Sequence, residues 1–376
     1  LHPWIPVQIP PKDIIMKRNP YYFAVDTEGN QLPYIDEIYC YQGLDEEVIN
    51  MKALAGELDL ALISIDLYPL AKKAEKAGKL KVRRMGGTAL NAAQLCYNLT
   101  HKDPVMRKIF RDKRFRIASS YAINRELINE TIFMGMSEPW QVASYEDSPY
   151  YNERLAHEYL EYDPERANRL LDEMGLDKRG PDGFRLRPDG KKLQITLLST
   201  TGWNVHLEKI AEIVTDNLRA VGLDVNLKIV DSSLILEKRA ANDIDAVLYG
   251  KSWGTNEGAF FDGMNAGYFV PCHSMGVFYA PLWNKWYLSR GKEGEKPVPD
   301  MLKAIEYYRE AISTVDPKKR KELWRKITDI AADNLWTIGT VKFPGYLKVI
   351  SPNLENFPTE PKPWDRGGDA GRVELW

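Results

Sequence analysis

Hydrophobic positions along the chain repeat with two different periods, which separate strands from helices. Residues 33–42, PYIDEIYCYQ, alternate their side chains with period two, as is typical of a half-buried strand. Residues 45–56, DEEVINMKALAG, place apolar side chains at helical spacing between a capping Asp45 and a terminating Gly56. A strand over residues 58–63 is expected next. A helix that leads into a buried strand indicates α/β architecture.

The middle of the chain repeats this alternation. The apolar run at residues 89–98, ALNAAQLCYN, predicts a buried strand, and two helices are expected within residues 103–133. Strand, helix and strand patterns then follow at residues 192–200, 206–223 and 224–231. These three form a βαβ unit, which requires a right-handed crossover and a covered, mostly parallel sheet.

The remaining segments complete an α/β chain of two or three domains. Pro164 begins a capped helix, and residues 177–190 are so rich in Gly and Pro that we expect a hairpin-like surface excursion. Two helices are expected within residues 297–334. The last pattern, residues 337–351, predicts a strand and a crossing segment.

Composition excludes several classes of protein. The chain has 51 Lys and Arg against 53 Asp and Glu, so general attraction to nucleic acid or anionic lipid is not expected. No apolar run approaches the roughly 20 residues that span a bilayer. The first residues, LHPWIPVQIPP, carry neither a basic n-region nor an apolar h-region, so any export signal is expected to lie upstream or to have been removed.

Motifs for catalysis or metal binding are scarce. Three cysteines and five histidines show no zinc-type spacing, and the GxSxG, Walker A and strand-linked GxGxxG motifs are missing, so we expect no metal and no cofactor. The acidic pairs Asp45/Glu46 and Asp243/Asp245 could serve as glycosidase carboxylates. Adjacent acids in caps and turns are usually solvated, however, so a binding protein is favoured over an enzyme.

Aromatic side chains are unusually frequent in segments that read as loops. They are Trp140, Trp203, Trp253, Phe260, Phe261, Tyr268, Phe269, Phe278, Trp283 and Trp286. Flat rings stack on the apolar faces of sugars or on ligand side chains, while nearby amides and carboxylates bond hydroxyls. Core packing is the simpler interpretation for four tryptophans, Trp283, Trp286, Trp324 and Trp336.

Trp253 is the strongest ligand candidate, because it ends the strand pattern of residues 243–253 and precedes a Gly-rich loop. Sites in α/β lobes lie at the carboxyl ends of strands. The complete set of candidate ligand-binding residues is Trp253, Asn256, Phe260, Phe261, Asp262, Asn265, Trp203 and Tyr249.

Several linked segments resemble the family 5 extracellular solute-binding proteins, which are dipeptide, oligopeptide and nickel receptors of ABC importers. They are RNPYYFAVDTEGNQLPYIDEI, ALAGELDLAL, LCYNLTHKDPVMRKIFRDKRFRIASSYAINRELINETIFMG, YDPERANRLLDEMG and LEKIAEIVTDNLRAVGLDVNLKIV, in that order. The resemblance implies an α/β fold of the class II periplasmic-binding-protein type, with mixed sheets in two lobes that close on a ligand.

The resemblance also implies that the N-terminal lobe is incomplete, because the family normally has a long segment before RNPYY. Residues 1–90 would be a remnant of that lobe, residues 91–340 the C-terminal ligand-binding lobe, and residues 341–376 a return segment. The hinge would then lie near residues 92–97 and 338–343.

The ligand class is a separate question. Peptide-binding members carry an Asp-Pro-Asp-like stretch after the strand that corresponds to residues 243–253, and this chain reads WGTNEGAFFDGMN there, with Asp262 as a displaced acid. Residues 18–38 and 174–190 resemble instead the branch that binds β-linked glucans, xylans and mannans. We therefore expect an oligosaccharide ligand, with oligopeptide, nickel or another small solute, and a carbohydrate-active enzyme as alternatives.

The implied partners are this ligand and the permease subunits of the importer, with no nucleic acid. A monomer in the periplasm or outside the cell is expected, with any membrane anchor in an N-terminal segment that precedes the chain.

Overall fold

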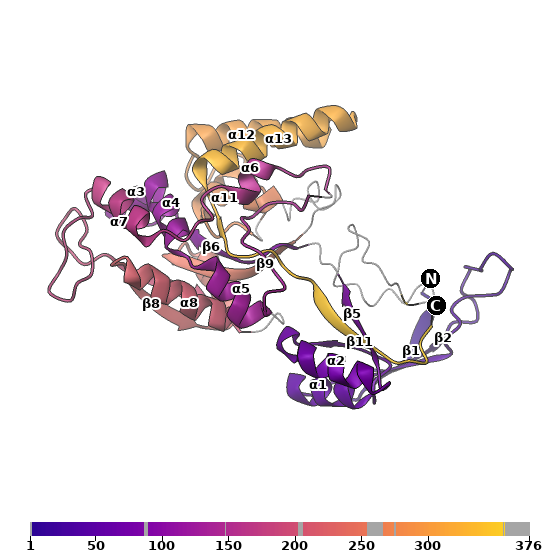
Figure 1. The fold of residues 1–376 in the computed structure, drawn as a ribbon. Helices are drawn as coiled ribbons and strands as arrows, with labels where there is room; N and C mark the ends of the chain where they lie inside the picture. The colour runs from indigo at the N-terminus through magenta and orange to yellow at the C-terminus, as the bar shows by residue number, and fades with distance from the viewer. Residues whose placement is uncertain are drawn as a thin grey trace. The chain divides into compact units, whose positions relative to one another are not determined.

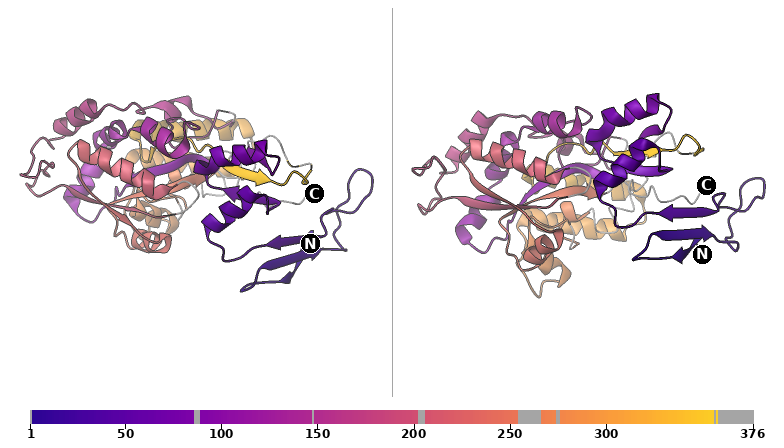
Figure 2. Two further views of the ribbon diagram at one scale, coloured as in Figure 1. Left: turned by 60° about the horizontal axis from the view of Figure 1, so that its bottom comes forward. Right: turned by 90° about the horizontal axis from the view of Figure 1, so that it is seen from below.

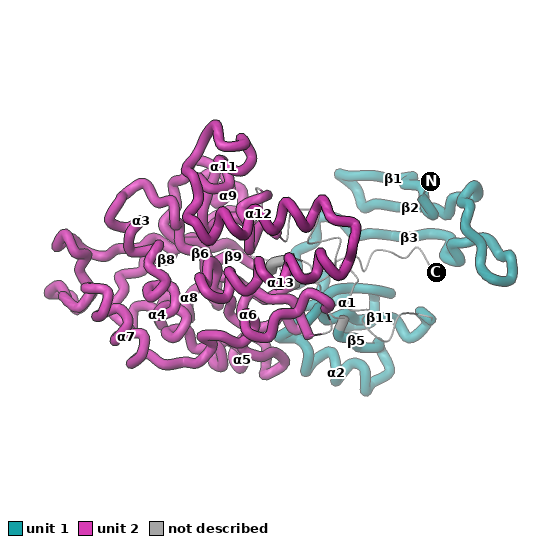
Figure 3. The backbone as a smooth tube through the Cα atoms, turned by 90° about the horizontal axis from the view of Figure 1, so that it is seen from above, with its two compact units in different colours: residues 1–87, 345–376 teal, residues 88–344 magenta. Residues whose placement is uncertain are grey.

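The chain folds into two compact units. The computed structural model describes residues 2–85, 89–146, 148–201, 206–253, 266–273, 276–355 and 357, with backbone alone at 85, 89 and 251–253. Unit 1 joins residues 1–87 to residues 345–376, and unit 2 comprises residues 88–344 (Figure 3).

Unit 1 contains two three-stranded antiparallel sheets (Figure 1). The first has the order β1 (Trp4–Gln8), β2 (Ile14–Arg18), β3 (Glu37–Cys40). The second has the order β4 (Leu60–Ile63), β11 (Tyr346–Ile350), β5 (Lys81–Met85). The helical segments are α1 (Glu46–Ala55), η1 (Ile65–Leu67) and α2 (Tyr68–Lys76). β11 comes from the C-terminal segment of unit 1 and lies between β4 and β5, which come from the N-terminal segment. The second sheet therefore requires both chain segments.

The predicted helix and strand at residues 45–63 are confirmed. Asp45 is the extended N-cap residue of α1, and Gly56 ends the helix in the left-handed conformation with φ 80°. A Cβ atom at Gly56 would lie 2.9 Å from the Lys79 carbonyl oxygen, so glycine is required there. The helices pack on one buried cluster with the second sheet, which comprises Ala53, Ala61, Ile63, Ala71, Leu80, Val82, Leu347 and Val349.

Unit 2 is built on one five-stranded sheet with the order β10-β6-β9-β7-β8, and Figure 2 shows this sheet with helices around it. Its strands are β6 (Ala89–Tyr97), β7 (Gln194–Ser199), β8 (Asp224–Ile229), β9 (Ala246–Trp253) and β10 (Ile338–Gly339). Its helices are α3 (Pro104–Arg111), α4 (Lys113–Ala122), α5 (Arg125–Phe133), α6 (Glu153–His157), α7 (Pro164–Glu173), α8 (Leu207–Ala220), α9 (Ser232–Ala240), η2 (Ala266–Tyr268), α11 (Pro281–Leu288), α12 (Pro299–Ser313) and α13 (Pro317–Asn334).

The sheet of unit 2 is mixed. β7 lies between β8 and β9 and is parallel to both, which confirms the βαβ unit. β6 and β10 are antiparallel to their neighbours, so the expectation of a mostly parallel sheet is wrong, whereas the mixed α/β fold implied by the resemblance is confirmed. Residues 103–133 form three helices rather than two. Asp112 and Asn124 each cap a new helix by accepting backbone N–H bonds, and so restart the helical chain.

The expected hinge position is wrong. Residues 92–97 and 338–343 both belong to unit 2, where Leu95 of β6 lies opposite Ile338 of β10. The apolar run of β6 is buried because it lies inside the sheet, not because it crosses between units. The chain passes from one unit to the other at residues 87–88 and 344–345.

A fully buried arginine joins α4 to the end of α13. The Nε of Arg116 donates to the carbonyl oxygens of Asn334 and Leu335, both at 3.1 Å, and Nη1 donates to that of Phe110. Burial lowers the pKa of Arg116 to about 9, which leaves the guanidinium charged at neutral pH. The positive charge lies at the C-terminal end of α13, where the helix dipole favours a cation.

We predict that Arg116→Met lowers the free energy of unfolding of unit 2 by about 3 kcal/mol, because buried carbonyl oxygens lose charged donors. Urea unfolding followed by circular dichroism measures this. Arg114→Met on the same helix is the control, since the partly exposed Arg114 pairs with Asp112 and should contribute less than about 1 kcal/mol. An equal loss of unfolding free energy in the two variants would contradict the stabilising role assigned to Arg116.

Candidate functional site

One edge of the unit 2 sheet collects the carboxyl ends of its three parallel strands. β7, β8 and β9 all end there, and β6 begins there because it is antiparallel to β9 and pairs Ala89 with Trp253. The first crossing between the units, at residues 87–88, immediately precedes β6. Ligands of α/β sheets bind outside the carboxyl ends of strands. We call this the carboxyl edge and take it as the candidate site.

The described side chains at the carboxyl edge include hydroxyl groups, an engaged carboxylate and the exposed Lys228 near the end of β8. Ser199 ends β7 fully buried, its hydroxyl has no hydrogen-bond partner among the described residues, and Thr200 follows it, also buried. Asp231, after β8, caps α9 by accepting the Ser233 N–H at 2.8 Å. Hydrogen bonds from Ser233 lower the pKa of Asp231, so the carboxylate is held in its cap. The described part of this edge therefore holds buried hydroxyl groups together with the capping Asp231, the exposed Lys228 and, at the start of α8, Glu208 paired with His206 at 3.5 Å.

Tyr249 is the one predicted site residue whose side chain the structure describes. Its ring lies 4.8 Å from that of Phe278, centroid to centroid, and is half-buried. Burial raises the pKa of Tyr249, and the charge of Asp231 raises it further, so the hydroxyl remains protonated at neutral pH. The sequence did not identify Phe278 as its partner. The pairing arises only because the segment after η2 folds over β9.

The other predicted residues remain predictions. The backbone of Trp253 ends β9 at the carboxyl edge, as expected, but its side chain lies outside the described residues. The remaining six also lie outside them, namely Trp203, Asn256, Phe260, Phe261, Asp262 and Asn265.

Most of the other loop aromatics belong to the core, not to a ligand surface. The buried ones are Trp140, Tyr268, Phe269, Phe278 and Trp283. Trp283 packs edge-on against Trp336 with ring centroids 5.9 Å apart, and Phe269 packs against Trp324 at 5.6 Å. Core packing is thus confirmed for Trp283, Trp324 and Trp336. A Gly-rich context does not distinguish a buried ring from an exposed one, because irregular segments also contribute to this core.

The acidic residues considered for glycoside hydrolysis are engaged elsewhere. Asp243 pairs with Lys102 and Lys238, and Asp245 accepts a hydrogen bond from His101 at 2.9 Å. They precede β9, and Asp245 accepts the Thr196 N–H of β7 at 2.8 Å, so both acids lie before the carboxyl ends of these strands. Asp45 and Glu46 are exposed at the start of α1.

The described residues form neither a metal site nor a membrane span. They contain no group of three or more His, Cys, Asp or Glu side chains arranged to hold a metal ion. Within the same residues, every helix is too short or too polar to cross a membrane.

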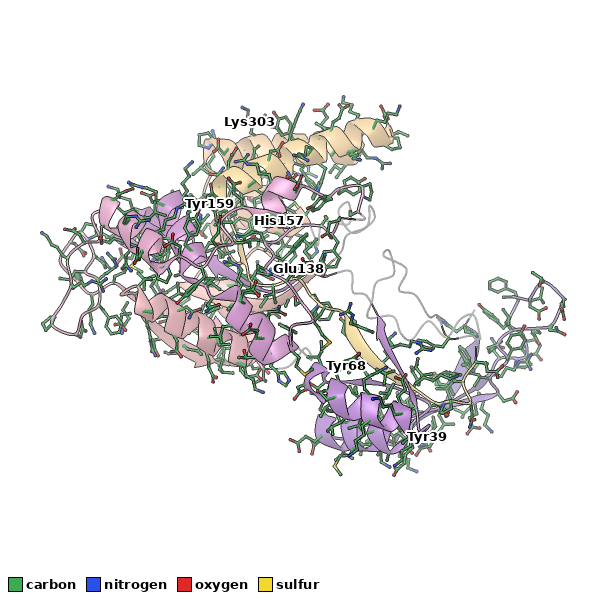
Figure 4. All side chains as sticks on the ribbon, in the orientation of Figure 1. Tyr39, Tyr68, Glu138, His157, Tyr159 and Lys303 are labelled. Carbon is green, nitrogen blue, oxygen red and sulfur yellow. The ribbon has the colours of Figure 1, made fainter. Side chains whose placement is uncertain are left out.

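A caged lysine fixes the chain just before the second crossing. The Nζ of Lys342 lies 2.9 Å from Glu138 and 2.8 Å from Glu146, and stands over the rings of Trp140 and Tyr145 at 4.6 and 4.9 Å from their centroids. Figure 4 marks Glu138. Burial alone would lower the pKa of Lys342, but the two carboxylates outweigh it and raise the pKa above its ordinary value.

The backbone around the cage is also held. The Lys342 N–H donates to the Glu138 carbonyl oxygen at 2.8 Å, and the Tyr145 hydroxyl donates to that of Phe343 at 3.1 Å. On the other side, Ala92 N–H donates to the Val341 carbonyl oxygen at 2.8 Å. The chain is therefore tied to unit 2 as far as Phe343, and the second crossing is confined to Pro344 and Gly345, whose φ is 94°.

The chain belongs to a family of binding proteins. It matches the profile described as "Bacterial extracellular solute-binding proteins, family 5 Middle" over residues 3–268. The resemblance seen in the sequence is thereby confirmed, and the family consists of solute-binding proteins rather than enzymes.

Individual relatives bind different solutes. The periplasmic alpha-galactoside-binding protein of Rhizobium meliloti is 26% identical, over 94% of this chain and 51% of its own length. The oligopeptide-binding protein AppA of Bacillus subtilis is 27% identical, over 96% of this chain and 59% of its own length. A solved structure of an oligopeptide-binding protein, OppA, matches with a TM-score of 0.73 and 33% identity, and covers 99% of this chain and 61% of that one. This chain thus spans only about half to three fifths of these proteins.

We predict that Lys342→Met speeds amide hydrogen exchange of residues 340–343 about tenfold, because losing charge-assisted bonds worth about 1.5 kcal/mol favours local opening. Exchange followed by mass spectrometry measures this. Lys319→Met, which removes only an exposed pair with Glu310, is the control and should leave these residues unchanged. Unaltered exchange in Lys342→Met would show that the cage does not hold the segment.

Proposed function

We propose that this chain is the ligand-binding part of an ABC-importer receptor and that it captures an oligosaccharide for delivery to a membrane permease. The observation that carries the proposal is the chemistry of the carboxyl edge. Its described side chains include the hydroxyl groups of Ser199, Thr200 and Tyr249, and the sequence continues from Trp253 into GTNEG without an Asp-Pro-Asp stretch.

This chemistry suits a neutral ligand. Sugar hydroxyls need donors and acceptors, and the apolar faces of sugar rings stack on aromatic side chains. The termini of a peptide carry charges that need opposite charges in a dry site. The carboxylate of Asp231 is engaged in capping α9, so it is not available for an ammonium group. The alpha-galactoside specificity of the Rhizobium meliloti relative supports a saccharide ligand.

An oligopeptide ligand is the second candidate. It is supported by the similarity to AppA and by the 33% identity to OppA, both of which bind oligopeptides. Asp262 is the residue that would then pair with the peptide's ammonium group. The family description, which calls its members extracellular, supports action outside the cytoplasm for either ligand.

Movement of the two units about each other would be absorbed at the two crossings. Strand pairing holds the chain on both sides of them, since Met85 pairs with Tyr346 in unit 1 and the Lys342 cage holds the second segment in unit 2. The sequence places Gly86 and Gly87 in the first crossing and Gly345 in the second. We therefore propose residues 344–345 as a bending point, in place of β10.

We predict that an oligosaccharide raises the melting temperature of the chain, whereas peptides do not. The panel holds cello-, xylo- and manno-oligosaccharides, α-galactosides and tri- to pentapeptides, with each ligand also incubated and examined for new products. At 100 times its Kd, a ligand stabilises the folded state by about 2.7 kcal/mol, which raises the melting temperature of a chain of this length by roughly 3 °C. A shift with peptides alone would favour the second candidate, and new products would indicate an enzyme.

We predict that Trp253→Ala weakens binding of the best ligand in that panel by about 1–3 kcal/mol and changes the melting temperature little, because the ring stacks on the ligand. Titration calorimetry and thermal unfolding separate the two effects. Trp283→Ala is the matched control, since Trp283 is fully buried and its loss should cost about 3–5 kcal/mol of stability. A large drop in melting temperature with unchanged affinity would place Trp253 in the core.

A further inference from the structure

The turn between α12 and α13 carries the most exposed large apolar side chain among the described residues. Residues 314–316 join the two helices, which pack along each other (Figure 1). Val315 in this turn is 90% exposed, and Ile312 in the last turn of α12 is 49% exposed. Single exposed hydrophobic residues are normal on a protein surface, so these two alone indicate no partner.

Four consecutive cations follow directly, at residues 318–321, which read KKRK. The three lysines are exposed. Lys319 pairs with Glu310 at 2.6 Å, whereas Lys318 and Lys321 form no ion pair with any described residue. We call residues 312–321 the basic tip.

The stability of α13 does not explain these cations. The helix begins at Pro317, so residues 318–321 occupy its first turns, where the helix dipole is positive and favours acidic side chains. Asp316 does suit this position, because its carboxylate accepts the Lys318 N–H at 2.9 Å and caps the helix. The adjacent cations repel both the dipole and one another. Residues that oppose local stability in this way are expected where function requires them.

The surroundings of the basic tip leave its charge positive. Residues 309–326 hold seven Lys and Arg against three Asp and Glu, although the whole chain has a net charge of −2. Of the three acids, Glu310 pairs with Lys319, Asp316 caps α13, and Glu322 is exposed. The chain therefore has one strongly positive end, which an anionic surface attracts even though the total charge is slightly negative.

The composition of the basic tip fits a lipid surface better than a protein or a nucleic acid. Protein interfaces are depleted in Lys and enriched in aromatic residues and Arg, whereas the tip has three Lys, one Arg and no aromatic residue. Exposed Val and Ile side chains contribute nothing to phosphate contacts along a nucleic acid. Exposed apolar residues bordered by lysines are typical of segments that lie in the interface of an anionic bilayer.

We propose that the basic tip binds the surface of an anionic phospholipid bilayer. The ammonium groups of Lys318 and Lys321 contact lipid phosphates, and the side chain of Val315 enters the interfacial layer. The contact is peripheral, in keeping with described helices that are too short or too polar to cross a membrane.

Vesicle flotation tests this proposal without a solute, so its failure is separate from failure of the proposed function. The vesicles contain phosphatidylcholine alone or with about 30% phosphatidylglycerol, at about 0.05 M and about 0.5 M NaCl. The variant is Lys318→Gln/Lys321→Gln. Lys108→Gln/Lys113→Gln is the matched control, because it removes the same charge from exposed positions on α3 and α4.

We expect the wild-type chain to bind only the anionic vesicles, and only at the lower salt concentration. Lys318→Gln/Lys321→Gln should weaken this binding about tenfold, with the control within about twofold of the wild type.

A fluorescent label reports whether Val315 reaches the lipid. An NBD group is attached to Val315→Cys in a Cys40→Ser background, in which the remaining Cys96 and Cys272 are buried. Its emission should shift to shorter wavelength with anionic vesicles and stay unchanged with phosphatidylcholine alone.

Three results would each overturn the proposal: no binding to anionic vesicles at the lower salt concentration, an equal loss of binding in the control variant, or binding without an emission shift. Binding to polyglutamate but not to vesicles would assign the basic tip to an acidic protein partner instead.

Discussion

The antiparallel pairing of β6 with β9 is the interaction on which the rest of unit 2 depends. It sets Ala89 opposite Trp253 and so brings the first residues after the crossing to the carboxyl edge. β10 then pairs with the other side of β6. β6 therefore positions the candidate site on one side and the return of the chain towards unit 1 on the other.

Buried cations hold the irregular segments around this sheet. Arg116 bonds carbonyl oxygens at the end of α13, and Arg125 donates to the carbonyl oxygens of Gly339 and Ser120. Lys342 holds its segment in place through ion pairs with two carboxylates and through contacts with aromatic rings. The contacts of Arg116 with Asn334, of Arg125 with Gly339 and of Lys342 with Glu138 join residues about 200 apart in sequence near the C-terminal return of unit 2. Burying a cation costs free energy, but leaving several buried oxygens without hydrogen-bond donors would cost more. A single charged side chain that donates to all of them is therefore favourable.

Local patterns predicted the elements of this fold well. The apolar run of β6, the N-cap position of Asp45 before α1, the left-handed Gly56 and the βαβ unit around α8 all depend on a few neighbouring residues. The antiparallel direction of β6 was not predictable in this way, because strand direction depends on a partner about 150 residues away. For the same reason the apolar run at residues 92–97 was taken for a crossing.

The candidate site was predicted less completely. The exit of β9 was identified correctly as the carboxyl edge, because strand order makes that end common to β7 and β8. The burial of Trp283 was predicted, but that of Trp140 and Phe269 was not, since a sequence of glycines and aromatics does not reveal which rings a distant segment covers. Nothing in the sequence indicated the Lys342 cage, because the residues that surround Lys342 lie about 200 positions before it in the chain.

The central claim is that a neutral oligosaccharide binds at the carboxyl edge. Amide hydrogen exchange of the chain with and without a saturating oligosaccharide tests it most directly. The account predicts that protection gained on binding is concentrated at residues 199–201 and 249–253, where β7 and β9 end. Protection at the opposite end of β9, beside Asp243 and Asp245, with none at the carboxyl edge, would contradict it.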